Sequence, residues 1–120
     1  MIRIDDALRD RGSRYAVTGA PATTRAEVEA HIATLKREKR FAKATHHSWA
    51  LVSSTEGPLK NDDGESGAGA VILKMLEREA LTDFAIIVTR WYGGTHLGGD
   101  RFAHIVTCTR ALLEAKRRGD

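Results

Sequence analysis

The segment FAIIVTR, residues 84–90, decides the fold because it is a short, continuous apolar run without polar alternation. Its β-branched residues and its length are typical of a strand in the centre of a sheet. We therefore expect residues 84–90 to form a central strand, with Ile86 and Val88 buried.

Two further strands are expected before this segment. The run SRYAVTGAP, 13–21, is apolar and is closed by Pro21, and HSWALVSS, 47–54, is rich in strand-forming residues. The Gly, Pro, Asn and Asp residues of TEGPLKNDDGE, 55–65, are typical of a turn-rich connection. We expect a long loop there.

Three helices alternate with these strands. The first begins at Thr24, since Glu27 three residues later completes a capping-box pattern. The second is expected in residues 68–80, which are apolar on most of a helix circumference. The third begins at Asp100 as N-cap and carries an apolar stripe as far as Leu113. The order predicts an α+β protein, a two-layer α/β sandwich with the helices on one face of a mostly antiparallel or mixed sheet.

Composition limits the organisation and the location of the chain. With 120 residues and 42% hydrophobic content, residues 1–120 are expected to form a single domain. Cys108 is the only cysteine, which excludes an internal disulfide and favours a cytoplasmic protein. The charged amino terminus lacks the pattern of a signal peptide, and no membrane association is expected. A net charge of +3 permits an acidic partner without requiring one.

The loop VTRWYGGTHLGGDRF, 88–102, allows two interpretations. In the first, its glycines let the chain reverse with positive φ while the aromatic residues cover the core. In the second, it lies beside DDGESGAG, 62–69, at one edge of the sheet and binds a partner. Exposed aromatic rings beside arginines suit stacked bases and phosphates.

Metal, nucleotide and catalytic sites are less well supported. GESGAG, 64–69, precedes a helix, but no Gly-Lys-Ser/Thr follows it and no buried strand precedes it. Asp62, Asp63 and Glu65 could hold Mg²⁺, although three acids in a turn more often cap amides. The histidines lack zinc spacing. His104 and Cys108 share a helix face, but a lone helical cysteine is usually a small buried hydrophobe. We expect no metal, no cofactor and no catalytic residue.

Three motifs carry a resemblance to a known family. KATHHSWA (43–50), DDGE (62–65) and VTRWYGGTHLGGDRFAHI (88–105) resemble, in order and spacing, the Impact N-terminal domain family, which includes bacterial YigZ-type proteins. The resemblance covers about residues 13–113. Bacterial members have a proline after the Asp-Gly-Glu motif, where this chain has Ser66 and a shorter loop.

The resemblance implies a fold shared with a ribosomal protein domain (ribosomal protein domain 2-like), with domain IV of elongation factor G and with the galactokinase group. The family has no established enzymatic reaction. Its eukaryotic members regulate translation by competing for the activator of a kinase that phosphorylates an initiation factor. They carry an additional RWD domain, and bacterial members carry an additional ferredoxin-like domain. We expect neither in this chain.

We therefore expect a non-enzymatic binding module that regulates translation or the general amino-acid control stress response. Its partner would be RNA, the ribosome or a translation-control protein, and its oligomeric state is open. The residues expected to contact the partner are Lys43, His46, Arg90, Trp91, Tyr92, Arg101 and His104. The residues expected to shape the loops or to hold an anion are Asp63, Gly64, Glu65, Gly67, Gly69, Gly93, Gly94 and Gly98.

Two alternatives stay open at this point. Arg90, Arg101 and His104 are expected to line one partly exposed cationic face. In the alternative, Arg90 and Arg101 are structural partners of Asp63, Glu65 or Asp100. The alternative function is an enzyme or a binder acting on a phosphorylated small molecule or nucleotide.

Overall fold

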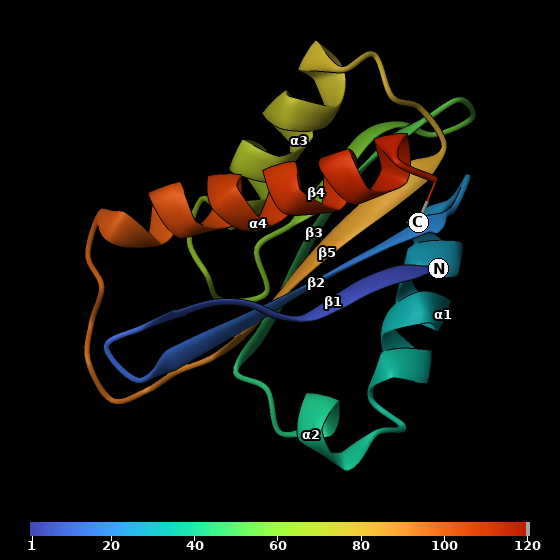
Figure 1. The fold of residues 1–120 in the computed structure, drawn as a ribbon. Helices are drawn as coiled ribbons and strands as arrows, with labels where there is room; N and C mark the ends of the chain where they lie inside the picture. The colour runs from blue at the N-terminus through green and yellow to red at the C-terminus, as the bar shows by residue number, and fades with distance from the viewer. Residues whose placement is uncertain (120) are drawn as a thin grey trace.

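In the computed structural model, which describes residues 1–119, a five-stranded sheet is covered by helices on both sides (Figure 1). The elements, in chain order, are β1 (Ile2–Asp10), β2 (Ser13–Pro21), α1 (Arg25–Leu35), α2 (Lys39–Ala42), β3 (His46–Ser53), β4 (Gly57–Asn61), α3 (Ala68–Arg78), β5 (Phe84–Trp91) and α4 (Asp100–Arg117).

The strands are arranged in the order β1-β2-β5-β3-β4, and each neighbouring pair is antiparallel. β5 lies in the centre, where Val88 is opposite Val17 of β2 and Ser48 of β3. Ile86 and Val88 are buried. The prediction of a central strand at residues 84–90 is confirmed, and of the two expected sheet types the antiparallel one is present rather than the mixed one.

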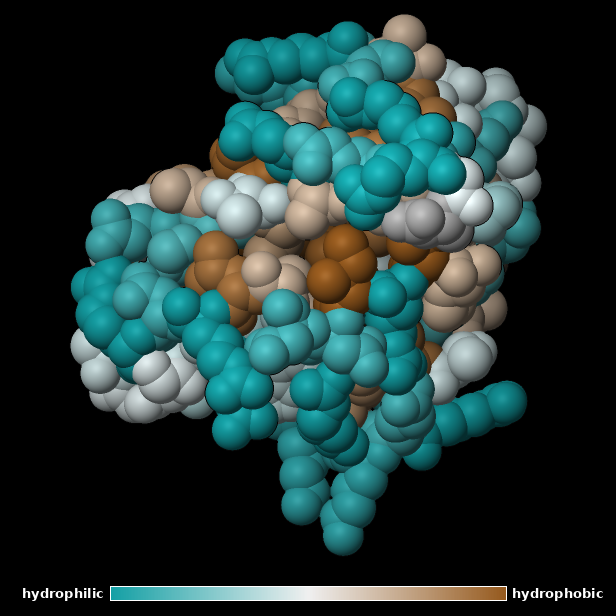
Figure 2. Space-filling view, in the orientation of Figure 1, coloured by the Kyte–Doolittle hydropathy of each residue, from teal (hydrophilic) through white to brown (hydrophobic). Residues whose placement is uncertain are grey.

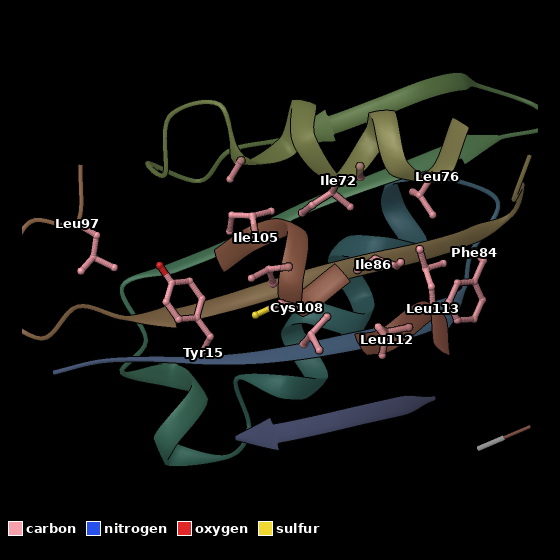
Figure 3. Packing of buried hydrophobic residues seen from close by; sticks show 14 residues of the cluster. Tyr15, Ile72, Leu76, Phe84, Ile86, Leu97, Ile105, Cys108, Leu112 and Leu113 are labelled. Atoms are coloured by element: carbon pink, nitrogen blue, oxygen red, sulfur yellow. The ribbon is translucent and has the colours of Figure 1, made fainter. Parts of the chain in front are cut away.

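Each face of the sheet has its own apolar cluster. On one face α3 and α4 cover residues such as Ile86, which packs with Leu112 and the other residues of the cluster in Figure 3. On the opposite face Ile87 packs with residues of α1 and α2. The α+β class is therefore confirmed, but the helices do not all lie on one face. A strand that is apolar on both faces needs a cover on both, and this is why residues 84–90 show no polar alternation.

The outer surface of the α3–α4 layer is mostly hydrophilic. Figure 2 shows apolar residues reaching this surface only as separate patches between polar side chains. Cys108, on α4, is fully buried between this helix and the sheet, and burial raises the pKa of its thiol to about 12. The interpretation of Cys108 as a small buried hydrophobe is confirmed. Among residues 1–119, no helix has both the length and the apolar character needed to cross a membrane.

Three elements were not predicted. β1 and β4 are the two edge strands, and neither contains a fully buried residue, so their apolar patterns are weak. β4 begins within the turn-rich sequence at Gly57 and contains Pro58, which an edge strand can accommodate. α2 has only four residues, too few for a periodic pattern.

The first residues of two helices test the capping predictions. At α1, Thr24 is the N-cap, and its hydroxyl accepts a hydrogen bond from the Glu27 amide at 3.2 Å, as predicted. At α4 the N-cap is Gly99, so the prediction that Asp100 is the N-cap is wrong. Asp100 is instead the first helical residue, and its carboxylate binds Arg11 at 2.6 Å.

Candidate functional site

One end of the sheet brings together most of the residues singled out from the sequence. β2 and β3 begin there, and β5 ends there. The loops 62–67 and 92–99 meet at this end, because Glu65 of the first binds Arg90, which precedes the second. The expectation that these two loops lie near each other at one edge of the sheet is confirmed.

Arg90 and Glu65 form a buried ion pair. Arg90 is 5% exposed and Glu65 is 2% exposed. Arg90 Nη1 donates to both carboxylate oxygens of Glu65, at 3.0 and 2.9 Å, and its Nη2 donates to Ser13 Oγ at 3.2 Å. The Nε2 atom of His46 lies 3.4 Å from Glu65 Oε2. Arg90 is therefore not part of an exposed cationic face, and the structural alternative with Glu65 as partner is the correct one.

His104 and its neighbours fasten α4 to the β1–β2 hairpin. His104 Nε2 lies 2.7 Å from Asp10 Oδ2. Arg11 contacts both Asp10, at 2.9 Å, and Asp100, at 2.6 Å. Hydrogen bonds from Arg11 and then from His104 lower the pKa of Asp10 to about 2. Arg101 is half-buried with its guanidinium 4.9 Å from the Phe102 ring centre.

The acidic loop is held by its own carboxylates. Asp62 accepts hydrogen bonds from the amides of Gly67 and Gly69, at 3.0 and 2.8 Å, and these bonds lower the pKa of Asp62, with that from Gly67 the larger cause. Asp63 accepts a hydrogen bond from the His47 amide at 2.8 Å. The acids therefore cap amides or pair with Arg90. The amides of Gly67 and Gly69, expected to be available to an anion, already face a carboxylate.

Two glycines in the second loop are required for different reasons. Gly94 has a φ of +90°, which confirms that one of the pair Gly93 and Gly94 adopts positive φ. Gly93 is required by a close approach, since a Cβ there would lie 2.0 Å from the carbonyl carbon of Gly12. The loop therefore packs directly on the β1–β2 hairpin.

Tyr92 covers the buried ion pair from outside. Its side chain is 42% exposed, and the Arg90 guanidinium lies 5.6 Å from its ring centre. Its backbone amide donates to Thr45 Oγ1 at 2.9 Å, which ties the end of β5 to the start of β3. His96 contacts the ring, with 5.5 Å between the two ring centres.

Trp91 points to the opposite face of the sheet, toward α2. Its Nε1 donates to the Arg40 carbonyl at 2.9 Å, and the Arg40 guanidinium lies 4.8 Å from the indole centre. Arg14 is directly opposite Trp91 in the β2–β5 register. Lys43, at the carboxyl end of α2, is exposed. We call this region the α2 surface, and its members are Arg14, Lys39, Arg40, Lys43 and Trp91.

The sheet thus separates the residues predicted to form one interface. Lys43 and Trp91 lie on the α2 surface, whereas Arg90 lies on the α3–α4 side. Arg14, Lys39 and Arg40 were missed. Strand alternation could have indicated Arg14, because a strand over 13–21 places it on the face opposite Tyr15.

The sequence of the chain matches the Impact N-terminal domain over residues 11–113. The chain belongs to the Impact N-terminal domain family. It is 34% identical over 125 residues to the Protein IMPACT homolog of Caenorhabditis elegans, covering 98% of this chain and 49% of that protein. It is 36% identical over 114 residues to Protein IMPACT of Bos taurus, covering 91% of this chain and 36% of that protein. The chain therefore spans half or less of the length of these Impact proteins.

Two solved structures are similar to this Impact domain. A crystal structure of a hypothetical protein superimposes with a TM-score of 0.74 at 23% identity, covering 92% of this chain and 54% of that one, which supports the fold alone. The structure of the two-domain translational regulator Yih1 matches with a TM-score of 0.52 at 29% identity, covering 89% of this chain and 43% of that one.

Proposed function

We propose that this Impact domain is a non-enzymatic binding module that takes part in the regulation of translation by contacting RNA, most simply RNA of the ribosome. Membership of the Impact family and similarity to a translational regulator support the biological setting. The observation that carries the proposal is the α2 surface, where exposed cations surround a partly exposed tryptophan.

The α2 surface combines exposed cations with the partly exposed indole of Trp91, which lies directly opposite Arg14 and against the Arg40 guanidinium. Arg14, Lys39 and Lys43 are exposed, and within residues 1–119 none of them lies within 4.0 Å of a carboxylate oxygen. Arg40 is 3.9 Å from Asp5, too far for a hydrogen bond. Cations without partners can replace the counterions of a phosphate backbone, and the release of those counterions drives binding.

This surface modifies the set of contact residues predicted from the sequence. Lys43 and Trp91 remain in the proposed interface, whereas exposed Tyr92 lies against Arg90 on the α3–α4 side. Arg90 and His104 pair with acidic residues and stabilise the fold. The proposed function therefore rests on α2 and on the strands β2 and β5 beneath it.

The test compares two variants that lose the same number of positive charges. The first carries Arg14→Gln, Lys39→Gln, Arg40→Gln and Lys43→Gln. The control carries four replacements of exposed cations on α3 and α4: Lys74→Gln, Arg78→Gln, Arg110→Gln and Arg117→Gln. Ribosome co-sedimentation and RNA affinity as a function of salt are measured for both.

We expect the α2-surface variant to lose co-sedimentation and the control to retain it. If each α2-surface cation neutralises one phosphate of a single strand, the log–log salt slope should flatten by about 3 units in the first variant. Equal losses in the two variants would contradict a defined interface. If binding survives nuclease treatment and does not depend on salt, the partner is a protein rather than RNA.

A further inference from the structure

Within the α2 surface, three side chains from three elements line one small hollow. Arg14 comes from β2, Arg40 from α2 and Trp91 from β5, and the hollow between them has a volume of about 100 Å³. That volume corresponds to roughly three water molecules at about 30 Å³ each. A hollow of this size can hold one small charged group such as a phosphate.

Arg40 is fixed in place at this hollow. Its guanidinium lies 4.8 Å from the ring centre of Trp91 and 5.0 Å from that of Phe41. The two rings also contact each other edge-on at 5.2 Å. Because two aromatic rings hold the planar guanidinium, less side-chain entropy is lost when a ligand binds to it.

The nearest carboxylate, on Asp5, is engaged elsewhere. Arg3 binds Asp5, and Arg3 also binds Glu38. The shortest distance between the Asp5 carboxylate and the Arg40 guanidinium is 3.9 Å, which is too long for a hydrogen bond. Arg40 therefore keeps donors for an added anion.

The position of Arg14 in β2 does not contribute to the stability of the sheet. Its direct cross-strand partner is Arg9 of β1, and like charges directly opposite each other destabilise an antiparallel pair. Arg9 is bound by Asp6 at 2.9 Å, whereas Arg14 has no carboxylate within ion-pair distance among residues 1–119. The Asp6 carboxylate also attracts Arg14 and Arg40 from a longer distance, but within the described part of the chain neither guanidinium has a hydrogen bond to a carboxylate, so an anion between them can still bind to both.

We propose that the hollow is a nucleotide subsite for single-stranded RNA. A backbone phosphate binds between the guanidinium groups of Arg14 and Arg40, and the adjacent base lies against the accessible part of the Trp91 indole. Guanidinium groups bind phosphate oxygens in a bidentate manner. Bases of single strands stack on aromatic rings and on guanidinium planes, whereas bases within a duplex are already stacked. This inference rests on the proposed function and assigns its partner and a contact point.

The fluorescence of Trp91 provides a direct test. The other tryptophan, Trp49, is only 2% exposed, so a ligand at the hollow changes mainly the emission of Trp91. The probes are a ten-residue oligoadenylate RNA, the same sequence as single-stranded DNA, an RNA duplex, AMP and inorganic phosphate. We expect the single strands to quench the emission at lower concentrations than the duplex, AMP or phosphate.

Two variants with equal charge loss separate the subsite from general attraction. Arg14→Gln should weaken oligoadenylate binding about tenfold, since it removes a charge-assisted phosphate contact. Lys39→Gln, outside the hollow, should weaken binding by less and leave full quenching at saturation. Trp91→Phe keeps an aromatic ring against Phe41 but removes the fluorophore, so its binding is followed by the anisotropy of a labelled oligoadenylate and should weaken several-fold. Melting temperatures within one degree or so of the wild type show that the fold is retained.

Identical losses for Arg14→Gln and Lys39→Gln would overturn the subsite. So would quenching by phosphate alone at the same concentration as by the oligonucleotide. If oligonucleotides fail to quench Trp91 while ribosomes still co-sediment through the α2 surface, the subsite is wrong and the proposed function stands. If ribosomes do not bind at all, the proposed function is also wrong.

Discussion

At the scale of single residues, Arg90 is predicted to stabilise the fold rather than to bind RNA. Replacement by Gln leaves the carboxylate of Glu65 buried without its bidentate partner. Breaking a buried pair in this way costs about 3–5 kcal/mol. We expect Arg90→Gln to lower the melting temperature strongly and to leave the salt slope of RNA binding unchanged.

The matched comparison is Arg14→Gln, which removes the same group from an exposed position. It should leave the melting temperature nearly unchanged and reduce the salt slope by about 0.7. If Arg90→Gln left stability intact and flattened the slope, the structural role of Arg90 would be contradicted. A double-mutant cycle with Glu65→Gln measures the coupling of the pair directly.

The two loop glycines make a second residue-level prediction. Gly94→Ala meets no atom within 4 Å but places a side chain at a φ of +90°, at a cost of about 1 kcal/mol. Gly93→Ala requires the backbone of Gly12 to move, because the added Cβ would lie 2.0 Å from it. Chemical denaturation should therefore show a larger loss for Gly93→Ala. Equal losses of stability in the two variants would mean that the β1–β2 hairpin can move away from the added Cβ without a further loss of free energy.

At the scale of elements, a buried histidine connects α2 to the sheet. His47 Nε2 lies 3.1 Å from the Phe41 carbonyl and Nδ1 lies 2.9 Å from Thr89 Oγ1. A neutral ring satisfies both contacts, with Nε2–H donating to the carbonyl and the Thr89 hydroxyl donating to Nδ1. Burial lowers the pKa of His47 below its usual 6.5.

This pKa shift predicts a pH dependence of stability. The unfolded chain takes up a proton on His47 near pH 6.5, and the folded chain does so only at lower pH. The free energy of unfolding should therefore be fully retained above pH 6.5 and should decrease as the pH falls below it. His47→Asn should be less stable at pH 8 and should lose this part of the pH dependence. A parallel decrease in both proteins would assign the effect to other groups.

The elements differ in how far the sequence could predict them. α1 has a capping pattern and β5 a continuous apolar run, and both were found. β1 and β4 are edge strands whose exposed residues hide the pattern of a strand. The spacing of apolar residues in α1 does not indicate which face of the sheet the helix covers. It follows from β5, because Ile86 and Ile87 are both buried and therefore need helices on opposite faces.

The candidate site was predictable only in part, for a similar reason. Lys43 and Trp91 were identified from local sequence. Arg14 becomes their neighbour only through the pairing of β2 with β5, a contact between residues far apart in the chain. For Arg90 the sequence left two interpretations open, because its partner Glu65 is 25 residues away and no local pattern selects Glu65 over other acidic residues.

At the scale of the whole molecule, the arrangement of charge matters more than its sum. A net charge of +3 is modest for a protein that binds nucleic acid. On the α3–α4 side, buried Arg90 is paired with Glu65, and His104 is paired with Asp10. On the α2 surface the exposed cations Arg14, Lys39, Arg40 and Lys43 lie around Trp91, a local concentration that the net charge does not reveal.

A charge-compensated variant tests this view. Arg14→Gln and Arg40→Gln remove two positive charges from the α2 surface. Glu77→Gln and Glu114→Gln remove two negative charges from exposed positions of α3 and α4, so the formal net charge returns to +3.

If net charge governed RNA binding, the fourfold variant would bind like the wild type. Because phosphates must contact particular guanidinium groups, we expect its affinity to remain as low as that of the double arginine variant, with a salt slope about 1.4 units flatter than the wild type. Fluorescence anisotropy of a labelled RNA measures both quantities. Recovery of affinity without recovery of Trp91 quenching would show that general attraction, rather than the α2 surface, holds the RNA.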